Sequence, residues 1–270
     1  SLDEYEYVTE KTGDGGEELL NVYANLKEDK PWAKKGHVVA RKQFILKDYF
    51  QQATVPSGFA AGSAPIVKKT ENGTRIFCDH DSWFFGQNGA LAEWYKDGEN
   101  QLVAPLEPYF CKAFNDNQQA SHLADRTKSW KDAGANRKLV SFEIDNKQSS
   151  HLALVYKYEL SVGADLTLTY RIYNGGELKV EMDYKPTKED IELIPKFGMR
   201  MRLPINYNNV EYYGRGPWEN YPDRKRSAFI GRYQMPLADM MTEYLHPQEN
   251  GNRCDVRWFE LKTPSLEGRA

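Results

Sequence analysis

One loop in the last quarter of the chain gathers residues that could do chemistry. Residues Glu211–Arg224 read EYYGRGPWENYPDR, and the last seven positions present an indole, two carboxylates, an amide, a phenol and a guanidinium. The glycines before them allow positive φ and Pro217 fixes φ, which predicts a turn. A loop so rich in charge is costly to order unless its groups pair with each other or with a ligand.

A second loop of the same character follows at Glu243–Trp258, which reads EYLHPQENGNRCDVRW. His246 lies near Glu243 and Glu249 in this loop, as a catalytic imidazole would, but we favour an ordinary loop or packing role for it. No His or Cys spacing in the chain is typical of a metal site, so no metal is expected.

The acids of the first loop stand beside arginines, and a neighbouring guanidinium lowers the pKa of a carboxylate. That environment suits an ion-pair network better than a general acid. We expect a partly buried network that holds the loop, formed by Arg215, Glu219, Asp223 and Arg224.

The elements that must position these loops are mostly strands. Short apolar and polar alternation is typical of half-buried strands, and turn signals such as Tyr173-Asn174-Gly175-Gly176 predict hairpins. Long strands joined by tight hairpins favour an all-β, antiparallel fold, with one helix expected at Ala124–Ala133. The strands are expected at Leu19–Leu26, Val38–Leu46, Ile66–Lys69, Thr74–Cys78, Ser82–Gly86, Ala90–Lys96, Lys138–Asp145, His151–Ser161, Asp165–Tyr173 and Glu177–Tyr184.

Composition narrows the class of protein. The chain has 36 basic and 39 acidic residues, and this balance lacks the basic excess of a nucleic-acid binder. No apolar run reaches the roughly 20 residues that span a bilayer, so neither nucleic acid nor membrane is an expected partner. The first residues lack the pattern of a signal peptide, which leaves a cytoplasmic or a periplasmic location open. Aromatic residues make up 13% of the chain, which favours strands. Flat rings also stack on the C–H faces of sugars, and a few of these rings could serve that purpose.

The two loops resemble the C-terminal β-sandwich domain, or small chain, of family-2 β-galactosidases. That domain carries a GxGPxENYPDR run and then a Tyr-x-x-Pro-x-Glu-Asn-Gly-x-Arg run. The first is present here as Gly214, Gly216, Pro217 and Glu219–Arg224. The second is present as Tyr244, Pro247, Glu249, Asn250, Gly251 and Arg253.

The resemblance implies a large, mutarotase-like antiparallel supersandwich preceded by part of an immunoglobulin-like domain. Residues 1-50 would be the last strands of the immunoglobulin-like domain and 51-65 a linker, since QATVPSGFAAGSAP within it has linker composition. Residues 66-270 would be the sandwich, truncated at its C-terminus.

A retaining family-2 enzyme removes terminal β-D-galactosyl residues with two glutamates on a (β/α)₈ barrel. This chain shows no alternation of strands and helices that would build such a barrel. The resemblance therefore implies a fragment that is inactive by itself, buttresses the barrel and forms part of the active-site wall. Its partners would be a galactoside and the rest of the parent chain, with a homo-oligomer left open. No cofactor is expected in the fragment, and a need of the parent for divalent and monovalent cations is left open. The alternatives are a stand-alone carbohydrate-binding β-sandwich module and, less favoured, an aldose-epimerase-like enzyme.

Candidate site residues follow from the same resemblance. Ala104–Gln119 resembles a family loop that ends in an acid–amide cluster, after which a mobile lip would correspond to about Gln118–Ala124. A simpler role for this Asn/Asp cluster is to cap the following helix, and both roles are compatible. The substrate-binding candidates are Asn117, Gln118, Trp218, Glu219, His246, Glu249 and Arg253. The structural motif residues are Gly214, Arg215, Gly216, Asp223 and Arg224.

Overall fold

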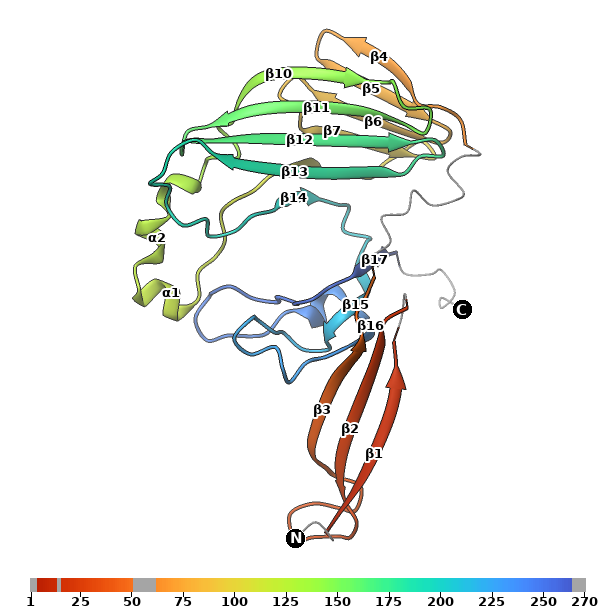
Figure 1. Ribbon diagram of the computed structural model, residues 1–270, viewed down its shortest axis with the longest axis vertical. Coiled ribbons are helices and arrows are strands. Elements are labelled where there is room, and N and C mark those ends of the chain that lie inside the picture. The colour runs from red at the N-terminus through yellow and green to blue at the C-terminus, as the bar shows by residue number, and fades with distance from the viewer. Residues whose placement is uncertain (1–3, 14–15, 51–61, 264–270) are drawn as a thin grey trace. The chain divides into compact units, whose positions relative to one another are not determined.

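The computed structural model describes residues 4–13, 16–50 and 62–263, and these residues form antiparallel sheets with little helix (Figure 1). The predicted all-β class is confirmed. Contacts divide the chain into two compact units. Thr54–Ile205 with Leu245–Glu249 is called the sandwich unit, and Ser1–Ala53 with Asn206–Tyr244 and Asn250–Ala270 is called the split unit.

The sandwich unit contains two antiparallel sheets that face each other (Figure 1). One sheet has the order β10-β11-β12-β13, and the other has the order β14-β9-β7-β6-β5-β4 with β8 paired to β7. Its strands are β4 (Ile66–Thr70), β5 (Gly73–Cys78), β6 (Asp81–Gly86), β7 (Leu91–Lys96), β8 (Glu99–Asn100), β9 (Ala104–Pro108), β10 (Lys138–Asp145), β11 (His151–Leu160), β12 (Ala164–Tyr173), β13 (Leu178–Pro186) and β14 (Met199–Arg202).

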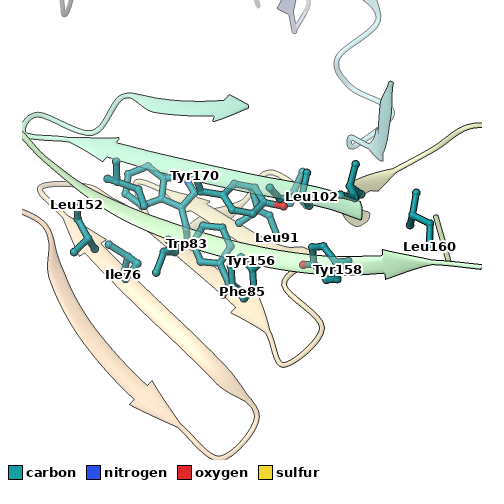
Figure 2. Packing of buried hydrophobic residues seen from close by; sticks show 14 of the residues in the cluster. Ile76, Trp83, Phe85, Leu91, Leu102, Leu152, Tyr156, Tyr158, Leu160 and Tyr170 are labelled. Carbon is teal, nitrogen blue, oxygen red and sulfur yellow. The ribbon is translucent and has the colours of Figure 1, made fainter. Parts of the chain in front are cut away.

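The core of the sandwich unit lies between these sheets because alternate side chains of each strand point inward. On β11 the even positions from Leu152 to Leu160 are buried, and they meet Ile76, Trp83 and Phe85 of the opposite sheet (Figure 2). The alternation read in the sequence therefore gives both the strand and its buried face.

The turn after β6 is clamped into this core. Tyr158 donates its hydroxyl proton to the carbonyl of Asn88 at 2.8 Å, and Tyr170 donates to the carbonyl of Gly89 at 3.1 Å. Gly89 has φ +73°, and a Cβ built there would lie 2.0 Å from the Tyr158 hydroxyl. Glycine is required at this position both by backbone conformation and by space.

The split unit holds two three-stranded sheets, ordered β1-β2-β3 and β16-β15-β17. The side-chain amide of Gln43 joins them, since it donates to the carbonyl of Ile230 at 2.9 Å and accepts from its N–H at 2.8 Å. The buried carboxylate of Glu17 adds a second link, accepting from Tyr213 at 2.6 Å and from Arg257 at 2.7 Å. The strands are β1 (Tyr5–Thr12), β2 (Glu18–Leu26), β3 (Val38–Lys47), β15 (Asn209–Gly216), β16 (Phe229–Pro236) and β17 (Trp258–Lys262).

The ten strands expected from the sequence are confirmed within a residue or two at each end. The prediction of one helix at Ala124–Ala133 is wrong. The chain instead forms α1 (Asp116–Ala120), α2 (Leu123–Arg126) and a 3-10 turn at Lys128–Trp130. His122, with φ +53°, separates α1 from α2, and Thr127, with φ −126°, ends α2.

Burial of one indole explains the path after α2. Trp130 is fully buried, with its ring 5.3 Å from Phe110 and 5.9 Å from Tyr184. This packing favours a tight turn over a continued helix. Part of the predicted linker, residues 51–61, lies outside the described residues, so the division at 51-65 stays a prediction.

Candidate functional site

The first motif loop is built around Glu219, whose side chain is only 4% exposed. One carboxylate oxygen accepts from the Arg224 guanidinium and the Tyr244 hydroxyl, and the other accepts from the N–H of Gly251 at 2.7 Å. Burial by itself would raise the pKa of Glu219, but the hydrogen bonds from Tyr244 and Gly251 and the charge of Arg224 lower it overall. Glu219 is therefore an ionised carboxylate that ties the first loop to the second.

Arg215 pairs with a carboxylate outside the expected set of four residues. Its Nε donates to Asp255 at 2.6 Å and its Nη1 to the carbonyl of Ala228 at 2.9 Å, while Lys225 reaches the same carboxylate at 3.1 Å. Burial opposes ionisation of Asp255, yet Arg215 and Lys225 lower its pKa. Asp223 is exposed and forms no ion pair with any described residue. Two separate ion-paired groups therefore take the place of the single predicted network, namely Glu219 with Arg224, and Asp255 with Arg215 and Lys225.

Asn220 is a residue that the sequence analysis missed. Its side chain is fully buried and donates to the carbonyls of Arg215 at 3.1 Å and Trp218 at 3.0 Å. Its carboxamide oxygen accepts from the N–H of Cys254 at 2.8 Å. The side chain of Asn220 therefore holds the two loops together through their main-chain groups. In the sequence, the only signal of this role is its position after the two turn glycines and before the second loop.

Arg253 completes the packing between the two loops. Its guanidinium donates to the Tyr212 hydroxyl at 3.1 Å, to the carbonyl of Pro217 at 2.8 Å and to the carbonyl of Gly251 at 3.1 Å. The motif glycines are required by close packing, since a Cβ on Gly216 would lie 2.2 Å from the Tyr212 hydroxyl. The polar groups of the two loops therefore form hydrogen bonds and ion pairs with one another, which explains how a sequence with so many charges is ordered.

Among the aromatic residues of the first loop, Trp218 is the exposed one. Its ring is 44% exposed, and the Arg41 guanidinium lies 4.8 Å from the ring centroid. The side chain thus offers a flat apolar surface beside a fixed positive charge.

The other candidates belong to the sandwich unit. Asn115 begins α1 with a reciprocal capping box, accepting from the N–H of Gln118 at 2.9 Å, while Gln118 accepts from the N–H of Asn115 at 3.2 Å. The expected capping role is confirmed, and Asn117 lies within the same helix. Glu249 pairs with Lys112 at 2.5 Å, both side chains being largely buried. His246 is exposed.

The seven substrate-binding candidates thus fall into two groups. Trp218, Glu219 and Arg253 lie in the split unit, and Asn117, Gln118, His246 and Glu249 lie in the sandwich unit. Their contact with substrate stays a prediction. Over the part of the chain that the structure describes, no three His, Cys, Asp or Glu side chains converge as metal ligands. No helix in that part is long and apolar enough to cross a membrane.

Fold and loops together define an all-β sandwich protein in whose motif loops Glu219 and Asp255 are ion-paired with cationic side chains. The family model of the beta-galactosidase small chain matches residues 79–267, and the model of beta-galactosidase domain 4 matches residues 2–47. The chain belongs to the beta-galactosidase small chain family, which confirms the resemblance read from the two loops.

Curated relatives agree with this assignment. The chain is 33% identical to a beta-galactosidase of Psychromonas ingrahamii over 259 residues, which cover 90% of the chain and 25% of that protein. It is 30% identical to one from Priestia megaterium, with 96% and 25% covered, and 29% identical to one from Vibrio cholerae, with 92% and 25% covered. The chain spans about a quarter of the length of these curated relatives.

Proposed function

We propose that the chain is one part of a retaining β-galactosidase, in which it buttresses the catalytic domain and forms part of the active-site wall. The observation that carries the proposal is the match of its family model together with the relatives named beta-galactosidase. In the same proposal, the substrate is a galactoside and the main partner is the remainder of the parent polypeptide. The proposal assigns no cofactor to this chain.

The electrostatics of the motif loops support a role without chemistry. A retaining glycosidase needs a general acid whose pKa is raised and a second carboxylate about 5–5.5 Å away. The ion pairs and hydrogen bonds described above lower the pKa of both Glu219 and Asp255. Carboxylates that stay ionised cannot deliver a proton near neutral pH, so the proposal places the catalytic pair elsewhere in the parent enzyme.

The test is hydrolysis of a chromogenic β-galactoside. The chain by itself should show background rates, and mixing it with the purified remainder of the parent polypeptide should restore turnover. A remainder whose two catalytic glutamates are replaced by glutamine is the control, and that mixture should stay inactive. If the chain alone hydrolysed the substrate and its Glu219→Gln variant did not, the proposal would be overturned, because a carboxylate of this chain would then be doing the chemistry.

A further inference from the structure

A groove of about 660 Å³ lies within the split unit, in the size range of small-molecule sites. One side of it is formed by β2 and β3, and the other by β16 and the first motif loop. Its lining includes Asn21, Tyr23, Arg41, Trp218 and Phe229. The two sides are held at a fixed spacing by the Gln43 amide, which bonds both main-chain groups of Ile230.

Aromatic rings and the guanidinium of Arg41 line one part of the groove. Arg41 lies between two rings, 4.8 Å from the centroid of Trp218 and 4.9 Å from that of Phe229. Its Nη2 donates to the carbonyl of Ser227 at 2.7 Å, which fixes the plane of the guanidinium. No carboxylate is present among the described residues that line the groove, so Arg41 offers its remaining donors to whatever enters.

A buried amide supplies a further donor. Asn21 is only 6% exposed and lines the groove. The main chain of Ile230 fixes the orientation of the Gln43 amide, and the Gln43 nitrogen donates to the oxygen of Asn21 at 2.9 Å. The Asn21 amide nitrogen is therefore the atom left over, and within the described residues it has no hydrogen-bond acceptor. The nitrogen lies at the groove, where water can accept its hydrogen bond until a ligand oxygen takes the place of that water.

We propose that this groove binds a saccharide, with a sugar ring stacked on Trp218 and its hydroxyl oxygens accepting from Asn21 and Arg41. A pyranose has flat C–H faces and many acceptor oxygens, which match an exposed indole beside the donors of Asn21 and Arg41. The ligand class rests on the proposed function, whereas the groove and its free donor do not. One open groove encloses a ligand only in part, so the dissociation constant should be about 1 mM or weaker, near −4 kcal/mol.

The experiment labels the six tryptophans of the full 270-residue chain with 5-fluorotryptophan and follows them by ¹⁹F NMR. Trp218→Phe identifies the resonance of Trp218. Lactose and methyl β-galactoside should shift that resonance in a saturable way, while the resonance of Trp32, which is 66% exposed outside the groove, should not move. Sorbitol at equal concentration controls for unspecific effects and should leave Trp218 unchanged.

Two variants test the donor. Asn21→Asp keeps the oxygen that Gln43 contacts and removes the amide donor, so affinity should fall by about fivefold or more, the equivalent of one hydrogen bond. Asn21→Ala should weaken binding by a similar factor. The other tryptophan resonances of the unliganded variants report whether the fold is intact, and the comparison uses whichever variant keeps them.

Three results would each overturn the inference. They are the absence of a saturable Trp218 shift up to about 100 mM saccharide, an equal shift with sorbitol, and an affinity unchanged by loss of the Asn21 donor. The proposed function is judged separately, by complementation of hydrolysis. A chain that complements but shows no Trp218 response refutes the groove and keeps the function, and a chain that binds saccharide but never complements does the reverse.

Discussion

Replacement of Glu219 by glutamine measures how the two motif loops hold each other. In the wild type one carboxylate oxygen accepts from Arg224 and Tyr244, and the other accepts from Gly251. A glutamine amide places an NH₂ group against at least one of these donors in either orientation. That leaves a buried N–H without an acceptor and removes the ion pair, for an expected loss of about 2–3 kcal/mol in the free energy of unfolding. The Coulomb part of that loss is small, because Arg224 is 53% exposed.

Urea unfolding followed by tryptophan fluorescence and circular dichroism is the assay. The matched control is Asp223→Asn, which makes the same carboxylate-to-amide change four residues away in the same loop, where the side chain is exposed. Its unfolding free energy should stay within about 0.5 kcal/mol of the wild type. Equal midpoints for Glu219→Gln and Asp223→Asn would refute the argument, since they would show that the Glu219 carboxylate does not bear on stability.

Two further predictions concern the buried turn at Gly89 and the effect of low pH on the contribution of Glu219 to stability. Gly89→Ala should destabilise the chain by about 3 kcal/mol or more because its Cβ would collide with Tyr158, whereas Gly98→Ala, at φ +85° with nothing within 4 Å, should cost only about 1 kcal/mol. Equal melting temperatures for the two variants would contradict this. The pKa of Glu219 is lowered by folding, so its contribution to stability is complete above its ordinary pKa of 4.5 and is lost as pH falls through the lower folded value. The difference in urea midpoint between wild type and Glu219→Gln should therefore shrink below about pH 4.5, and a constant difference down to pH 3 would disprove it.

Local patterns were sufficient to predict most of the strands. On β11 and β12 alternate residues are buried, and the turn glycines between strands have the positive φ that turn chemistry demands, as Gly175 and Gly176 do at +92° and +93°. The class of fold can be predicted from such signals because strand periodicity and hairpin turns each depend on residues that are close together in the sequence.

Contacts between distant segments could not be predicted in the same way. The partner of Arg215 is Asp255, 40 residues away, whereas the sequence offered Asp223 as the nearer acid. The free donor of Asn21 depends on Gln43 and Ile230, which meet it only in the folded sheet arrangement. The helix expected at Ala124–Ala133 failed for a related reason, because burial of Trp130 overrides local helix propensity.

The links made by Glu17 have a consequence for synthesis of the chain on the ribosome. Glu17 bonds Tyr213, 196 residues later, and Arg257, 240 residues later. At about 5–20 residues per second, the first of these partners is made roughly 10–40 s after Glu17 itself. The segment between β3 and β15 is therefore made before the contacts of Glu17 with Tyr213 and Arg257 can form. Slower translation between β3 and β15 would lengthen the time before Glu17 meets these partners, so the yield of correctly folded chain should depend on codon usage across the intervening segment.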